Sequence, residues 1–281
     1  MKTGIVDVGG GLRGSYGCGV FDYCMDKGIS FDVCVGVSAG SGNIASFLAG
    51  QRGRSLRFYV DYAFRKEYMS FRNLVQKGAY LDVQYIYGTL TDQGGEDPLD
   101  YDALARNPSQ MIVVASDAVS GKSRYFTKED LKRNDYGIMK GSSSIPVVCK
   151  PFPVGDRLYY DGAISDAIPL GQAFGRGCEK VVLVLTRPKG MSISGKRETR
   201  LSRFIRYRYP ETAKNLCLRA KRYNEGVARA RELEKKGSVL IVAPKSIEGM
   251  KTLTRDKKQI MDLYERGYAD AAAINRFVSP R

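Results

Sequence analysis

The stretch Phe31-Asp-Val-Cys-Val-Gly-Val-Ser-Ala-Gly-Ser-Gly-Asn-Ile-Ala-Ser-Phe-Leu-Ala49 decides the fold. It opens with the apolar run Phe31–Val35, which is typical of a buried strand. The sharp turn Gly36-Val37-Ser38-Ala39-Gly40 follows, and Ser41–Ala49 continues as a helix. A Gly-x-Ser-x-Gly turn between a strand and a helix is a nucleophile elbow, which exposes its serine hydroxyl. A serine that caps a glycine-flanked helix gives the same pattern, so this turn alone leaves both interpretations open.

Strand and helix patterns alternate on both sides of this stretch. The strand patterns lie at Thr3–Val8, Met111–Ser116, Val181–Thr186 and Val239–Ala243, with a hairpin at Phe152–Tyr160. The helical patterns lie at Ser15–Lys27, Pro210–Lys236 and Arg255–Val278. Such alternation predicts an α/β fold in which helices cover both faces of a mostly parallel central sheet.

A second glycine motif, Gly9-Gly10-Gly11-Leu12-Arg13-Gly14, follows the first strand and precedes a helix. Adjacent glycines allow backbone N–H groups to converge on an anion. That anion could be the oxyanion of an ester's tetrahedral intermediate or a dinucleotide pyrophosphate, and a purely structural turn is a third interpretation. A dinucleotide site also requires an acidic residue at the carboxyl end of the second strand, whereas Asp32 stands at its beginning.

A third motif, Asp161-Gly162-Ala163, turns out of a strand that ends at Tyr159-Tyr160. An aspartate that is partly desolvated among apolar neighbours has a raised pKa and can accept a serine proton. An ordinary turn aspartate is the structural alternative. The chain contains no histidine. A Ser-His-Asp triad is therefore excluded, and a catalytic Ser38 would require a carboxylate or an amine as its base.

These three motifs, in this order and without histidine, resemble the patatin-like phospholipase family. The segment Ser142-Ser-Ser-Ile-Pro146 is similar to a small-residue segment that the family carries ahead of its Asp-Gly turn. The resemblance covers roughly residues 3–186. It implies a three-layer α/β/α patatin-like fold, the absence of a metal or other cofactor, and a Ser-Asp catalytic dyad.

The resemblance also implies a role for each motif residue. Ser38 would be the nucleophile and Asp161 the base, and Gly9, Gly10 and Gly11 would form the oxyanion hole. The supporting motif residues are Leu12, Arg13, Gly14, Gly36, Val37, Ala39, Gly40, Gly162 and Ala163. Asp166 matches a structural acidic position, where it would cap the helix through Leu170–Phe174. The family often has Asn at the next position, which is Ala167 here.

Positive charge is concentrated in the last third of the chain. Residues 1–186 hold 21 Lys and Arg against 20 Asp and Glu, whereas residues 187–281 hold 24 against 10. We predict one patatin-like domain over residues 1–281. It would contain a motif-bearing core (1–186), a basic helical excursion (187–236), and a returning strand with a C-terminal helix (237–281).

The basic excursion places arginines at positions 197, 200, 203 and 206, with Leu201, Phe204, Ile205 and Arg208 on or near the other side. Such an amphipathic helix is suited to an anionic membrane surface, although a solvated charged helix is the simpler alternative. No nucleic-acid-binding motif accompanies the charge, so we expect no nucleic-acid partner. The N-terminus reads as a strand and the six cysteines as reduced thiols, which predicts a cytoplasmic protein, peripheral at the inner membrane face if it binds lipid.

The sequence therefore predicts a serine acyl-hydrolase that cleaves lipid carboxylic esters through an acyl-serine intermediate. The activity expected is that of a phospholipase A, a lysophospholipase or an esterase. Two alternatives remain: a dinucleotide-binding oxidoreductase that uses the Gly9–Gly14 loop, and a catalytically silent lipid-binding module.

Overall fold

Strand β1 (Thr3–Asp7) lies inside the sheet between two parallel neighbours, and its five residues are all buried. In the computed structural model, which describes residues 1–279, the strand order is β5-β6-β3-β2-β1-β7-β8, and β4 also pairs with β3. The strands are β2 (Val33–Val37), β3 (Gln110–Asp117), β4 (Ser123–Thr127), β5 (Phe152–Val154), β6 (Arg157–Asp161), β7 (Lys180–Val184) and β8 (Val239–Val242).

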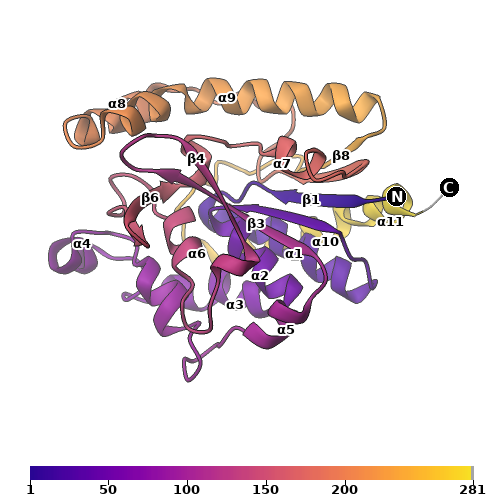
Figure 1. Ribbon diagram of the computed structural model, residues 1–281, viewed down its shortest axis with the longest axis horizontal. Coiled ribbons are helices and arrows are strands. Elements are labelled where there is room, and N and C mark those ends of the chain that lie inside the picture. The colour runs from indigo at the N-terminus through magenta and orange to yellow at the C-terminus, as the bar shows by residue number, and fades with distance from the viewer. Residues whose placement is uncertain (280–281) are drawn as a thin grey trace.

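Strands β3, β2, β1, β7 and β8 run parallel, whereas β4, β5 and β6 are joined by antiparallel pairing. Among the parallel strands, β2 and β7 have apolar sequences that match burial on both faces. Figure 1 shows helices on both sides of the sheet. The predicted α/β class and three-layer α/β/α fold with a mostly parallel sheet are confirmed.

One face of the sheet packs against α7 (Leu170–Phe174) and α9 (Pro210–Lys235), above the sheet in Figure 1. The helices below it include α1 (Ser15–Asp26), α2 (Ala39–Leu48), α3 (Arg54–Val60), α5 (Tyr101–Arg106), α6 (Gly137–Ser142) and α10 (Lys257–Asp270). The remaining helices are α4 (Phe71–Lys77), α8 (Lys196–Ile205) and α11 (Ala272–Val278). None of the helices within residues 1–279 combines the length and the apolar character that crossing a bilayer requires.

Several boundaries differ from the prediction, and three of the differences have a local reason. Strand β2 extends to Val37, because its backbone pairs with β3 as far as Val114. Helix α10 begins only at Lys257, because the Asp256 side chain caps it by accepting the Gln259 N–H. The last residues of the predicted C-terminal helix, Ala272–Val278, form a separate helix, α11.

The basic excursion contains α8 and α9, and β8 then pairs with β7 in the same sheet. Leu201 and Ile205 of α8 pack into a small apolar cluster with Tyr160 and Tyr209. Phe204 is 73% exposed and is not part of this cluster, so its predicted place on the side away from the arginines stays a prediction. The division of residues 1–281 into a core, an excursion and a return stays a prediction.

Candidate active site

Ser38 is the single residue between the end of β2 and the start of α2. Its backbone has φ 56° and ψ −130°, a conformation that non-glycine residues seldom adopt. The turn is possible because its neighbours lack side chains. A Cβ at Gly36 would lie 2.6 Å from the Cα of Ser41, and one at Gly40 would overlap the carbonyl oxygen of Asp7. The segment therefore has the geometry of a nucleophile elbow.

The segment that begins at Ser142 connects Ser38 with Asp161. The Ser142 Oγ accepts the Ser38 N–H at 2.9 Å and donates to the carbonyl of Val114 at 2.6 Å. Two residues further on, the Ser144 carbonyl accepts the Asp161 N–H at 2.8 Å. Sequence reasoning noted this small-residue segment but gave it no role. Because it holds the backbone of both residues, it fixes their separation.

Asp161 ends β6 and is only 7% exposed. Burial raises the pKa of its carboxyl above the ordinary value of 3.8. Three neighbours oppose this rise: the nearby Ser38 hydroxyl, the Ala163 N–H at 2.9 Å, and the positive charge of Arg219. The structure thus places Ser38 and Asp161 beside one cavity, although Ser38 follows β2 and Asp161 ends β6.

The glycine loop lies beside this pair and has positive φ at Gly9 (64°), Gly10 (135°) and Gly11 (62°). The Gly9 N–H donates to Asp7 Oδ1 at 2.9 Å, and its carbonyl accepts the Thr186 hydroxyl at 2.5 Å. Within residues 1–279, the N–H groups of Gly10 and Gly11 donate to no protein acceptor. Gly9 therefore shapes the loop, and the next two amides remain available to an anion.

Asp7 is a site residue that sequence reasoning missed. It is fully buried, and desolvation raises its pKa to about 6. Its carboxyl also accepts the Asn43 side-chain amide at 2.9 Å. Asn43 in turn donates to the Gly14 carbonyl at 3.0 Å and accepts the Tyr59 hydroxyl at 3.0 Å. This network ties the glycine loop to α2 and α3, and the only sequence signal was an acidic residue close to the glycines.

The supporting motif residues pack around this centre. Leu12 and Val37 are buried in apolar clusters, and Gly14 leaves room for the Tyr59 hydroxyl and the Ala39 methyl group. A Cβ at Gly162 would overlap the Val114 carbonyl oxygen. The Arg13 guanidinium is buried and donates to Thr252 Oγ1 at 3.2 Å.

Two cavities meet at Ser38. The first is mainly apolar, and its walls include Leu12, Phe58, Met69, Leu81, Met139 and Leu253. The second has a volume of about 320 Å³, and Gly10, Gly11, Ser38 and Asp161 all line it. Ser38 lines both cavities, so an ester held at its hydroxyl could extend into each of them.

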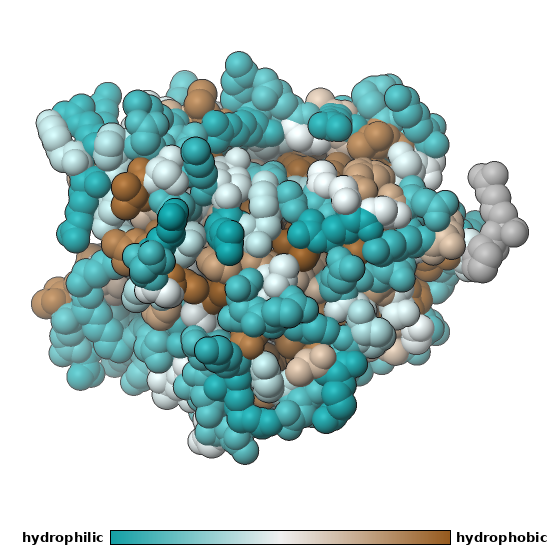
Figure 2. Space-filling view, viewed as in Figure 1, coloured by the Kyte–Doolittle hydropathy of each residue, from teal (hydrophilic) through white to brown (hydrophobic). Residues whose placement is uncertain are grey.

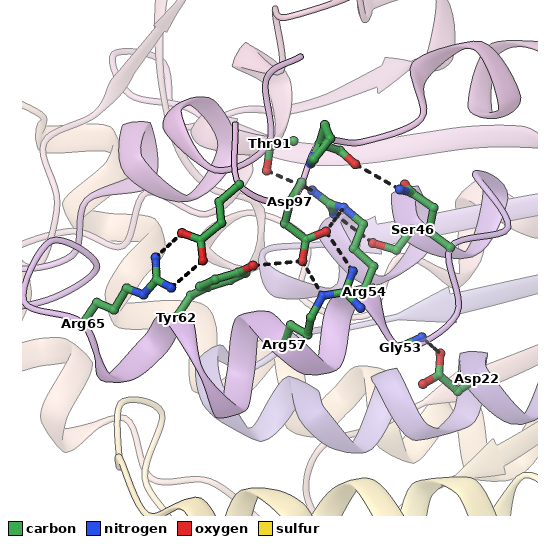
Figure 3. Close-up of polar contacts among 12 residues, drawn as sticks. Asp22, Ser46, Gly53, Arg54, Arg57, Tyr62, Arg65, Thr91 and Asp97 are labelled. Carbon is green, nitrogen blue, oxygen red and sulfur yellow. Dashed lines mark hydrogen bonds and ion pairs between the residues drawn. The ribbon is translucent and has the colours of Figure 1, made fainter. Parts of the chain in front are cut away.

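A buried ion-pair network supports the wall of the apolar cavity (Figure 3). Arg54 lines this cavity and is 4% exposed. It donates to Ser46 Oγ at 3.0 Å, Thr91 Oγ1 at 3.1 Å and the Asp97 carbonyl at 2.8 Å. The Asp97 carboxylate lies 3.5 Å from Arg54 and pairs with Arg57 at 2.6 and 2.9 Å. The network joins α3 to the segment before α5.

One predicted role is wrong, and one predicted position is confirmed. Asp166 does not cap α7, whose N-cap is Pro169; its carboxyl accepts the Tyr125 hydroxyl at 2.8 Å instead. Asp32 precedes β2, as the sequence indicated, and accepts the Thr3 N–H at 2.7 Å. It therefore lies at the opposite end of that strand from Ser38, where it cannot serve a dinucleotide bound at the glycine loop.

Two family models match parts of the chain. A family model described as patatin-like phospholipase matches residues 8–174, and one described as a domain of unknown function (DUF6363) matches residues 209–276. The Escherichia coli (strain K12) protein described as uncharacterized protein YjjU is 27% identical over 209 residues, which are 73% of this chain and 57% of that protein. The chain thus spans little more than half the length of this relative.

The crystal structure of VipD from Legionella pneumophila superposes with a TM-score of 0.48 at 10% identity, covering 97% of this chain and 66% of that chain. The patatin-like model covers more than half of the chain and contains all three motifs. The chain therefore belongs to the patatin-like phospholipase family, whose general activity is the hydrolysis of lipid acyl esters.

Proposed function

We propose that this protein is a serine acyl-hydrolase that cleaves lipid carboxylic esters, as a phospholipase A, a lysophospholipase or an esterase. Ser38 is the nucleophile and Asp161 the base of a catalytic dyad. One observation carries the proposal: the Ser38 hydroxyl meets the desolvated Asp161 carboxyl in a cavity that Gly10 and Gly11 also line.

In the first half of the reaction, Asp161 accepts the Ser38 proton as Oγ bonds to the ester carbonyl carbon. The carbonyl oxygen becomes an oxyanion, which the N–H groups of Gly10 and Gly11 stabilise. The intermediate then collapses, and Asp161 returns the proton to the departing alcohol. The products of this half are the free alcohol and an acyl-serine.

In the second half, water takes the place of the alcohol. Asp161 accepts a proton from water as its oxygen attacks the acyl carbon, and the same two amides hold the new oxyanion. The Ser38 oxygen leaves and recovers the proton from Asp161. A free fatty acid is released, and the enzyme returns to its starting state without any metal or other cofactor in the scheme.

A serine-directed fluorophosphonate probe tests this proposal. Wild-type protein should be labelled and Ser38→Ala should not, because the Ser38 hydroxyl lies beside both a base and the amides of Gly10 and Gly11. Ser143→Ala is the matched control, since Ser143 also lines the apolar cavity but its hydroxyl contacts Tyr87 at 3.2 Å. Intact-mass spectrometry reads out the label. Unlabelled wild type would support a catalytically silent lipid-binding module instead.

We further propose that α8 holds the protein at an anionic membrane surface, as a peripheral protein of the inner face in a cytoplasmic setting. Exposed Arg200 and Arg203 lie on α8, and exposed Phe204 and Tyr207 lie on or just after it. In Figure 2 the upper band of the molecule, where Figure 1 draws α8 and α9, is mainly hydrophilic with scattered hydrophobic groups. Cations that surround a few exposed aromatic rings suit the membrane interface.

Vesicle sedimentation tests this second proposal. Binding to vesicles rich in phosphatidylglycerol should weaken as salt rises, because each basic side chain near the surface contributes about 1 kcal/mol that salt screens. The triple variant Arg200→Gln, Arg203→Gln and Arg206→Gln should lose most of the binding. Arg106→Gln, Lys132→Gln and Lys258→Gln together remove equal charge from other exposed positions and should bind normally. Equal loss in both triple variants would refute a role for α8.

A further inference from the structure

Four arginines line the larger cavity beside Ser38. Arg13 comes from the glycine loop, Arg187 follows β7, and Arg197 and Arg219 come from α8 and α9. The cavity wall holds two acidic residues, Asp161 and Glu198, and the Glu198 carboxylate pairs with Arg219 at 3.0 Å. Positive charge therefore exceeds negative charge in this cavity.

Within residues 1–279, the positive charge of Arg13 has no carboxylate partner. Arg13 is 4% exposed, its Nη1 donates only to the neutral Thr252 hydroxyl, and its Nε is buried with no acceptor. Burial lowers its pKa to about 9, and the positive charges of Arg187, Arg219 and Arg197 act in the same direction. A buried guanidinium without a carboxylate is costly, and a bound anion would remove that cost.

The position of these arginines relative to Ser38 defines what the anion can belong to. A Cβ on Gly10 would lie 3.3 Å from Arg13 Nη2, so the guanidinium lies directly beside Gly10 of the glycine loop. The apolar cavity meets the arginine-lined cavity at Ser38. An ester carbonyl at Ser38 thus has an apolar space for its acyl chain and a cationic space for its alcohol.

We propose that the arginine-lined cavity is a leaving-group subsite that binds a phosphate on the alcohol part of the ester. The inference rests on the proposed function and names its substrate class: acyl esters of phosphorylated alcohols, with a phosphomonoester preferred to a neutral alcohol. Planar guanidinium groups suit phosphate, because each can donate two parallel hydrogen bonds to its oxygens.

The subsite is a feature of the C-terminal part of the chain. Arg187, Arg197 and Arg219 all lie beyond residue 174, where the match to the patatin-like family ends. The catalytic centre is thus supplied by the family motifs, whereas most of the cationic wall comes from the excursion and its junction with β7. The basic excursion would then select the substrate in addition to attracting a membrane.

A matched pair of soluble esters tests the subsite: 1-hexanoylglycerol 3-phosphate and 1-hexanoylglycerol. The short chain keeps both substrates monomeric, so attraction to a charged interface cannot contribute. Wild type should prefer the phosphate ester roughly 10- to 100-fold in kcat/KM, since a charged hydrogen bond contributes about 1.5–3 kcal/mol. In Arg187→Gln/Arg197→Gln this ratio should fall toward one. Arg219 is left intact because its charge acts on the Asp161 pKa.

The control is Lys132→Gln/Lys258→Gln, which removes two exposed cations away from the cavity and should keep the wild-type ratio. In a second assay, glycerol 3-phosphate should inhibit wild-type hydrolysis of p-nitrophenyl butyrate competitively, more strongly than inorganic phosphate does. The Arg187→Gln/Arg197→Gln variant should lose this inhibition.

A wild-type ratio near one, or equal inhibition by inorganic phosphate and glycerol 3-phosphate, would overturn the subsite. Ser38 would still be labelled by the fluorophosphonate in that case, and the proposed function would stand. If wild type is not labelled and cleaves neither ester, the proposed function and the subsite fall together.

Discussion

Replacing Asp161 with Asn is expected to reduce kcat by roughly 10²- to 10⁴-fold, the usual contribution of a positioned general base. The amide can still accept the Ala163 N–H that now reaches Oδ1. The turn should therefore persist while the capacity to take a proton is lost. Fluorophosphonate labelling should slow by a similar factor. Circular dichroism and the urea midpoint of the variant should confirm that it is folded.

The same substitution should remove the acidic limb of the pH profile. Asp161 works as a base only when it is deprotonated, so kcat/KM should fall as pH drops through its pKa. Burial raises that pKa above 3.8, and the limb should therefore lie above the range of an exposed aspartate. The chain has no histidine, so no imidazole contributes to this region of the profile.

Asp7 is the competing source of an acidic limb, since its pKa is about 6 and it holds the Gly9 N–H. The residual activity of Asp161→Asn distinguishes the two carboxyls. If its acidic limb survives at the wild-type midpoint, Asp7 produces the limb. Full turnover in the variant would exclude Asp161 as the base. Asp166→Asn is the matched control, because the Asp166 carboxyl contacts Tyr125, and this variant should keep the wild-type profile.

Local sequence was sufficient to predict the fold class and the three motifs. Gly36 and Gly40 are required by the backbone at Ser38, and the loop from Gly9 to Gly11 has positive φ throughout. These are properties of a few consecutive residues, so they leave a pattern in the chain. Burial of β2 and β7 on both faces likewise leaves continuous apolar runs.

The contacts that hold the site together left no such pattern. Ser142 reaches Ser38 across 104 positions, and Asn43 reaches Asp7 across 36. Single serines and asparagines are common in any sequence, and only the folded chain selects these partners. The excess of arginine after residue 186 was visible, but periodicity alone directed attention to the outer surface of α8. That Arg197 also lines a cavity with Arg13 depends on how α8 packs against α9.

Replacing Asp97 with Ala is expected to lower the free energy of unfolding by about 3–5 kcal/mol, because it leaves a buried charge without its counter-ion. Arg54 is 4% exposed, and burial already lowers its pKa to about 10. The Asp97 backbone carbonyl would still accept from Arg54, but no carboxylate would remain beside it. The loss of Asp97 costs less at Arg57, because the Arg57 side chain is 48% exposed and its charge can be solvated by water.

The neighbouring residue provides the control for this stability prediction. Glu96 also forms a double hydrogen bond with an arginine, Arg65, but the two side chains are 53% and 36% exposed. Glu96→Ala should therefore cost less than about 1 kcal/mol. The double variant Arg54→Met/Asp97→Leu should recover much of the loss, because it removes both charges. Urea unfolding gives the free energy of unfolding of all three variants, provided that the m value is unchanged. Equal losses for Asp97→Ala and Glu96→Ala would contradict the argument, since burial of the charge is the only difference on which it depends.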